Sequence, residues 1–159
     1  MKKNNNEKGF SLVELLVVVI IIAIVAAIAI PNLLASRKAA NEASAISSLR
    51  TYHSAESTYF ATFGNNSGYA TQAQLGTNKL VDTNLGPASG TPSKSGYDFA
   101  MTLTPTTFVD YCVKASPQAN QGTYFYATSS SVGGVIYKAN AAMTCAADGT
   151  FTVSGAPIQ

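Results

Sequence analysis

The chain opens with a long apolar stretch that contains one carboxylate. Residues 10–30 are almost continuously apolar, and Glu14 is the only charged residue among them. A helix of about twenty apolar residues, rising 1.5 Å at each, spans roughly the 30 Å hydrocarbon thickness of a bilayer. The pattern therefore predicts a helix over residues 10–30 that is long enough to cross a membrane.

A second pattern continues this helix beyond the apolar stretch. Residues 32–63 contain neither glycine nor proline, and the glycine and two asparagines at 64–66 form a stop signal. Apolar side chains recur at three- and four-residue steps, which is typical of an amphipathic helix running to Phe63. The side expected to face a core carries Ala39, Ala43, Ile46, Leu49, His53 and Phe60, and the opposite side carries Lys38, Asn41, Ser48, Tyr52 and Tyr59.

Pro31 lies where the two patterns join. A proline inside a helix removes one amide donor and crowds the carbonyl four residues earlier, here that of Ala27, so we expect a kink at Pro31. The predicted helix therefore has an apolar part over residues 10–30 and an amphipathic continuation over residues 31–63.

Residues 64–159 change to a turn-rich, β-leaning pattern that predicts a globular head. Most of residues 65–95 is expected to be loop, with a short helical turn near residues 71–75. Strands are predicted at residues 97–103, 108–114, 123–127, 135–138 and 151–153, with Gly133-Gly134 as a hairpin turn. Strands this close together favour an antiparallel sheet, and the amphipathic helix supplies its apolar cover. The predicted fold class is α+β: one long N-terminal helix packed on a small antiparallel sheet.

Charge is scarce and concentrated at the start of the chain. Charged residues make up 11% of the 159 positions. The first nine residues hold Lys2, Lys3, Lys8 and Glu7, which leaves seven basic and seven acidic residues in the rest of the chain. A polar but nearly uncharged surface suits packing beside identical copies and gives no sign of nucleic-acid binding.

The sequence offers no constellation typical of an enzyme or a metal site. His53 is the only histidine, and no acid or cysteine is placed to make it catalytic or metal-ligating, so it is interpreted as a core or contact residue. The aspartates at 82, 98, 110 and 148 are scattered and form no calcium loop. We therefore expect no catalytic residue, no metal and no cofactor, and an enzyme is the weakest of the hypotheses.

Two cysteines, Cys112 and Cys145, lie in the C-terminal half of the chain. An even number of cysteines in an exported protein suggests a disulfide. Closing a loop of about 33 residues would stabilise the fold by roughly 3–4 kcal/mol on the chain-entropy model. Two buried free thiols are the alternative.

Glu14 decides between three interpretations of the apolar stretch. A carboxylate near the centre of a membrane costs roughly 2.5–3.5 kcal/mol on insertion scales, so it usually has a partner. A secretory signal peptide fits the basic start and the small residues near Ala27 and Ala29, but the stretch is long for one and contains an acid. A simple membrane anchor leaves Glu14 unexplained. The third interpretation cuts the chain between Gly9 and Phe10 and keeps the apolar stretch.

The sequence Gly9-Phe10-Ser11-Leu12-Val13-Glu14-Leu15-Leu16, followed by the apolar stretch, resembles the type IV prepilin signature, which type II secretion pseudopilins share. The resemblance implies that residues 1–9 are a leader, which a membrane aspartic peptidase removes on the cytoplasmic side before it methylates the new Phe10 amine. It also implies a partner for Glu14, the Phe10 amine of a neighbouring subunit. A charge pair in a medium of low dielectric attracts strongly, so it would set the register between copies.

The resemblance implies a function and a set of partners. The chain would be a structural subunit that polymerises into a type IV pilus, a helical homopolymer, with the pilin-like fold predicted above. By analogy it would depend on the prepilin peptidase, a cytoplasmic assembly ATPase and an inner-membrane platform protein, and would need no nucleic acid. The precursor and the unassembled subunit would lie in the inner membrane, and the assembled pilus would be extracellular. In such pilins the C-terminal region is often closed by a disulfide, which favours a Cys112–Cys145 bond.

Three alternatives stay open at this point. A type II secretion pseudopilin would build a short periplasmic filament from the same start, and a minor pilin of a DNA-uptake system would share it as well. An exported binding module, with residues 1–29 as a cleaved signal peptide, would be a soluble protein that begins near Ile30.

Overall fold

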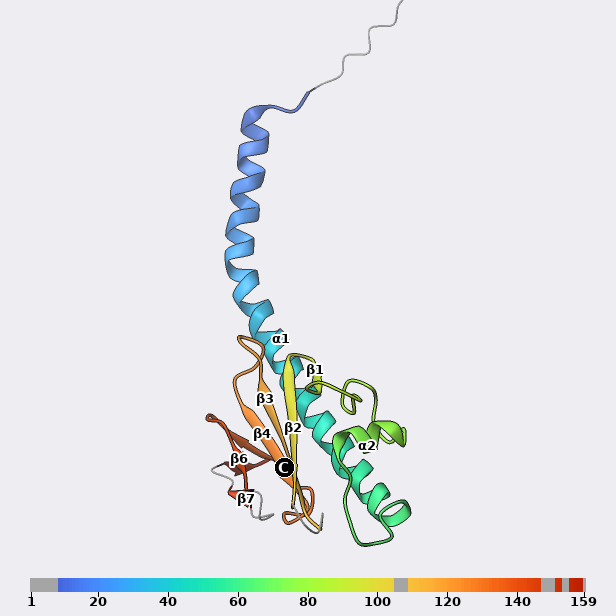
Figure 1. Cartoon of the computed structure of the whole chain (residues 1–159). Helices are drawn as coiled ribbons and strands as arrows, with labels where there is room; N and C mark the ends of the chain where they lie inside the picture. The colour runs from blue at the N-terminus through green and yellow to red at the C-terminus, as the bar shows by residue number, and fades with distance from the viewer. Residues whose placement is uncertain (1–8, 105–108, 147–150, 153–154, 159) are drawn as a thin grey trace, which may run out of the picture. The chain divides into compact units, whose positions relative to one another are not determined.

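The computed structural model describes residues 9–104, 109–146, 151–152 and 155–158, and it has an α+β fold (Figure 1). The chain divides into two compact units, one of residues up to Ser36 and one from Arg37 onward. The elements are α1 (Leu12–Thr62), α2 (Gln72–Thr77), β1 (Ser93–Lys94), β2 (Tyr97–Leu103), β3 (Tyr111–Pro117), β4 (Phe125–Ser129), β5 (Tyr137–Ala139), β6 (Thr144–Cys145), β7 (Phe151–Thr152) and β8 (Ala156–Pro157). The predicted fold class, one long helix and a small antiparallel sheet, is confirmed.

Helix α1 supplies residues to both units, and Pro31 lies inside it. It ends where the sequence predicts, because Asn65 and Asn66 adopt left-handed backbone conformations with φ of 49° and 56°. The amides of Phe63 and Gly64 both donate to the carbonyl of Tyr59, which closes the last turn.

The larger sheet belongs to the second unit and has the strand order β1-β2-β3-β4-β5-β8, with every neighbouring pair antiparallel. Strand β2 occupies the predicted residues 97–103. Strands β3, β4 and β5 each begin two or three residues later than predicted, and Phe108 and Val153, at the ends of two predicted strands, lie outside the described residues. Gly133 and Gly134 form the predicted turn between β4 and β5, both with positive φ.

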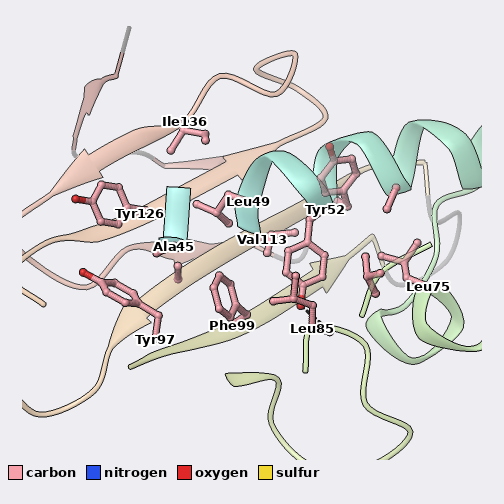
Figure 2. Packing of buried hydrophobic residues seen from close by; sticks show 14 of the residues in the cluster. Ala45, Leu49, Tyr52, Leu75, Leu85, Tyr97, Phe99, Val113, Tyr126 and Ile136 are labelled. Atoms are coloured by element: carbon pink, nitrogen blue, oxygen red, sulfur yellow. Dashed lines mark hydrogen bonds between the residues drawn. The ribbon is translucent and has the colours of Figure 1, made fainter. Parts of the chain in front are cut away.

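The core of the second unit lies between α1 and one face of this sheet (Figure 2). Leu49 and Tyr52 of α1 are fully buried, and the ring of Tyr52 lies 5.8 Å from that of Phe99 on β2. The sheet contributes alternate residues to the same cluster: Tyr97, Phe99, Tyr111, Val113, Ala115 and Tyr126. This alternation along the strands is what places one face of the sheet against the helix.

The buried side of α1 agrees with the periodicity at Ile46 and Leu49 but differs from it elsewhere. Ser48 and Tyr52 were expected on the outward side and are buried, whereas Ala39 and Ala43 are exposed. Both buried polar groups have hydrogen-bond partners, one within α1 and one distant in the chain. The Tyr52 hydroxyl donates to the carbonyl of Leu85, and the Ser48 hydroxyl donates to the carbonyl of Ser44 at 2.9 Å. Burial of a polar group costs little when its hydrogen bonds are met, so the helix can turn this side inward.

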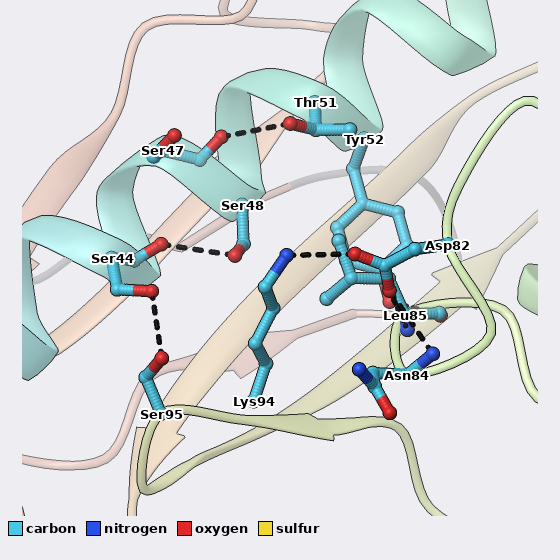
Figure 3. Close-up of polar contacts among 10 residues, drawn as sticks. All are labelled: Ser44, Ser47, Ser48, Thr51, Tyr52, Asp82, Asn84, Leu85, Lys94 and Ser95. Atoms are coloured by element: carbon cyan, nitrogen blue, oxygen red, sulfur yellow. Dashed lines mark hydrogen bonds and ion pairs between the residues drawn. The ribbon is translucent and has the colours of Figure 1, made fainter.

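Two polar contacts hold the segment around β1, one to α1 and one to Asp82 (Figure 3). The hydroxyl of Ser44 donates to that of Ser95 at 2.9 Å, and Lys94 pairs with Asp82 at 2.7 Å. The hydrogen bond from Lys94 holds the pKa of the Asp82 carboxyl below its usual range. The second unit therefore contains its own stretch of α1 as an integral part.

Candidate functional site

The N-terminal half of α1 exposes nearly all of its apolar side chains. Its most apolar 18-residue window has a mean hydropathy of 3.3, and none of that window is buried. Phe10, just before the helix, is 91% exposed. By length and composition α1 can cross a membrane. A helix with this surface must be covered by lipid or by other helices.

Glu14 lies in the first turn of α1 and takes part in a reciprocal cap. Its Oε2 atom accepts a hydrogen bond from the backbone amide of Ser11 at 2.8 Å, while the Ser11 hydroxyl accepts from the amide of Val13 at 3.3 Å. This resembles the capping box formed by serine and a glutamate three residues later. A carboxylate at this end also complements the helix dipole.

This cap was not among the sequence predictions, which gave Glu14 only a partner in another subunit. The Ser-x-x-Glu spacing at 11–14 is the signal that would have revealed it. Glu14 therefore has two separable properties, a local role at the helix start and a charge in an apolar setting.

The predicted leader junction precedes the helix. Gly9 and Phe10 are described and lie outside α1, whereas residues 1–8 of the leader lie outside the described residues. A Cβ atom added to Gly9 would meet no atom within 4 Å. Gly9 and Phe10 therefore lie before the first turn of α1, and cleavage between them stays a prediction.

The two cysteines are joined. Cys112 on β3 and Cys145 on β6 form a disulfide, with their Cα atoms 5.9 Å apart across 33 residues. This confirms the bond that the resemblance favoured. It attaches the chain beyond β5 to the centre of the larger sheet, since β6 pairs only with β7 among the described strands.

His53 has the contact role that was predicted. It is half-buried, and its Nδ1 atom lies 2.5 Å from the hydroxyl of Tyr111. The ring also packs against Gly134, where a Cβ atom would come within 2.4 Å of His53 Nε2. This close approach explains a glycine at that position.

Three of the four aspartates are described, and each has a different partner. Asp82 pairs with Lys94, Asp98 accepts from Gln118, and Asp110 accepts from Ser130. Asp148 lies outside the described residues. In the part of the chain that the structure describes, no three histidine, cysteine or acidic side chains come together as a metal site would require.

Comparisons with known proteins agree with these features. Residues 4–30 match the family model described as the prokaryotic N-terminal methylation motif. The chain is also 36% identical over 139 residues to the type IV wide pilus major component PilA4 of Thermus thermophilus, an alignment that covers 87% of this chain and 92% of that protein. The aligned length exceeds either compact unit, so the similarity includes both the apolar segment and the head.

Proposed function

The chain belongs to the type IV pilin family, and we propose that it is cut after Gly9 and polymerises through the N-terminal half of α1 as a repeated, major subunit of a type IV pilus. Pilins are structural proteins, and we propose that this chain performs no catalysis. One observation carries the proposal: the N-terminal half of α1 is apolar and exposed, whereas between Ala45 and Glu56 the same helix buries one side in its own head.

Assembly would move the apolar half of α1 from lipid into contact with other copies of itself. Lipid tails are as apolar as leucine, so this exchange gains little from the hydrophobic effect. Close packing between helices and pairing of polar groups must then supply the driving force. Because each copy offers two different surfaces, such contacts produce an open helical filament.

Glu14 would provide the polar pairing. Cleavage after Gly9 creates a charged amine on Phe10, which needs a partner in an apolar bundle. A carboxylate has about four lone-pair positions, so the bond from the Ser11 amide leaves capacity for the Phe10 amine of a neighbouring subunit. The pair would fix the register between subunits, because either charge left alone in the bundle is costly.

Processing and export complete the proposal. A prepilin peptidase would cut at the Gly9–Phe10 junction and methylate the Phe10 amine. The helix would anchor the subunit in the inner membrane until a platform protein and a cytoplasmic ATPase extend the filament. Pro31 would allow α1 to bend, because its missing amide leaves the carbonyl of Ala27 without its helical donor.

The experiment replaces Glu14 with glutamine and Ser11 with alanine in separate strains and measures the filament sheared from cells. Leaving the Phe10 amine unpaired costs about 3–5 kcal/mol, so Glu14→Gln should reduce filament by at least about tenfold. Ser11→Ala removes the cap hydroxyl but keeps the charge, and should leave filament yield nearly unchanged. Membrane levels of the processed subunit serve as the control for expression.

Normal filament yield from Glu14→Gln would overturn the pairing role. Equal losses from the two variants would assign the effect of Glu14 to helix capping instead.

A further inference from the structure

Glu56 is a carboxyl group buried in the head, far along the sequence from the assembly segment. It lies near the end of α1 and is 0% exposed. Among the described residues it is the only acidic or basic residue in the buried class. A charge in such a place is costly unless it is paired and fully hydrogen-bonded.

The hydrogen bonding of Glu56 is incomplete. Its Oε2 atom accepts from the backbone amide of Ala70 at 2.9 Å. Its Oε1 atom has no hydrogen-bond partner among the described residues. Ala70 is itself fully buried and directly precedes Thr71, the N-cap of α2. The single bond therefore joins the end of α1 to the start of α2 across the intervening segment.

The groups that face Glu56 do not compensate a negative charge. Two tyrosines lie near Glu56: Tyr69 in the segment after α1 and Tyr111 on β3. Burial raises the pKa of both hydroxyls, and the nearby Glu56 carboxyl raises it further. Asp110 adds to the raised pKa of Tyr69. His53, one turn earlier on α1, is bonded to the Tyr111 hydroxyl. The one ion pair in the described part of the chain is Lys94–Asp82.

We propose that Glu56 is a protonation-controlled latch, which holds residues 64–71 against α1 while its carboxyl is neutral and releases them when it ionises. A neutral carboxyl is tolerated in this aromatic setting with one hydrogen bond. An ionised carboxylate requires several donors, and the Ala70 amide supplies only one. Residues 64–71 lie between α1 and α2 and contain no helix or strand, so their displacement is the least costly way to admit water.

The direction of the pH dependence follows from burial. Burial raises the pKa of Glu56 from 4.5 to about 8, and the bond from Ala70 opposes this rise only in part. Below pH 4.5 the folded and unfolded chains both keep the proton, and the stability of the latch is fully present. As the pH rises toward 8 the unfolded chain loses its proton and the folded chain keeps it, so stability falls. Above about pH 8 the loss is complete, and the segment should open more often than at pH 6.

The test follows the full chain in detergent micelles by NMR, with the glutamate side-chain carboxyls labelled with carbon-13. The variant is Glu56→Gln, which resembles the neutral carboxyl. The control is Glu42→Gln, which also removes one negative charge from α1, but at a half-buried site that accepts from Thr123 and Tyr126.

One carboxyl should titrate near pH 8 in the wild-type chain and in Glu42→Gln, and be absent from Glu56→Gln. In the wild-type chain and in Glu42→Gln, the amide chemical shift of Ala70 should change with pH at the same midpoint. In Glu56→Gln it should not change with pH. Amide exchange at Ala70, corrected for intrinsic rate, should accelerate by up to about tenfold per pH unit between pH 4.5 and 8 and level off above the midpoint, unless the carboxyl is removed.

The proposal is overturned if the carboxyl missing from Glu56→Gln titrates in the ordinary range below about pH 6. It is equally overturned if Ala70 exchange accelerates to the same degree in Glu56→Gln and the wild-type chain. If Glu56→Gln does not fold, the wild-type chain alone still tests the proposal. The Ala70 amide shift must then have the same midpoint as the carboxyl that titrates near pH 8.

Discussion

The two halves of α1 share one backbone conformation but find their partners in different places. The N-terminal half carries large aliphatic side chains such as Ile20 and Ile24, and these are exposed. The C-terminal half is richer in serine, threonine and alanine, yet Ala45 and Leu49 within it are completely buried. Hydropathy alone would assign the core to the wrong half. The more apolar half of the helix is therefore suited to partners outside the chain.

The C-terminal half can be buried because its polar groups bond within the head. Ser48 donates to the preceding turn of α1, Tyr52 to the carbonyl of Leu85, and Asn41 to the carbonyl of Gln121 at 2.9 Å. Each bond removes the cost of placing a polar atom against the sheet. The N-terminal half has few such groups, which suits it to contact with lipid or with apolar helices.

Truncating one leucine in each half tests the comparison most strongly. Leu49 is 0% exposed and Leu16 is 51% exposed. Leu49→Ala should lower the free energy of unfolding of the head by about 2–5 kcal/mol through a cavity in its core. Leu16→Ala should change it by less than about 0.5 kcal/mol. Denaturant unfolding of the full chain in micelles, followed by near-ultraviolet circular dichroism of the tyrosines, measures both, and equal losses would break the distinction between the halves.

Removing the disulfide should affect the head alone. Replacing Cys112 and Cys145 together with alanine frees a loop of 33 residues, and should cost roughly 3–4 kcal/mol of head stability on the chain-entropy model. Helix content contributed by the N-terminal half should be unchanged. Far-ultraviolet circular dichroism beside the same denaturant unfolding measures both quantities, and a loss of helix at low denaturant would contradict the separation of the two regions.

The smallest expected effect comes from the exposed ion pair beside α1. Lys94 and Asp82 are both more than one third exposed, so solvent screens their attraction. Lys94→Ala should lower head stability by about 0.2–1 kcal/mol. Thermal unfolding in low and high salt measures the effect, which should shrink in salt. A loss as large as that of Leu49→Ala would mean that this exposed pair, between Lys94 of β1 and Asp82, stabilises the head as much as burial of Leu49 does.

Sequence pattern predicted much of the fold because the signals were long or regular. The helix had an uninterrupted run and a clear stop, and β2 had alternating apolar residues. The two-residue strands β1, β6 and β8 were missed, since two residues carry no periodicity. Ser48 and Tyr52 were predicted on the wrong side of α1 because both count as polar, and only the finished fold supplies the partner of Tyr52 at Leu85.

The candidate site was predicted in a different way. The junction at Gly9 and the acid at Glu14 were recognised from a short signature, not from periodicity. The cap between Ser11 and Glu14 was equally present in the sequence and was overlooked. Local hydrogen bonds of this kind follow from spacing alone, whereas the burial of Glu56 depends on contacts between segments that are distant in the chain.

The central claim is that the chain is trimmed to Phe10 and placed in a filament through the exposed half of α1. Intact-mass and N-terminal peptide analysis of protein sheared from the cell surface tests this claim most directly. The chain is expected to begin at Phe10, to carry one additional methyl group on its amine and to be lighter by two hydrogens for the Cys112–Cys145 bond. A chain that begins near Ile30 and is found free in the medium would contradict it, because the apolar half of α1 would then have been discarded.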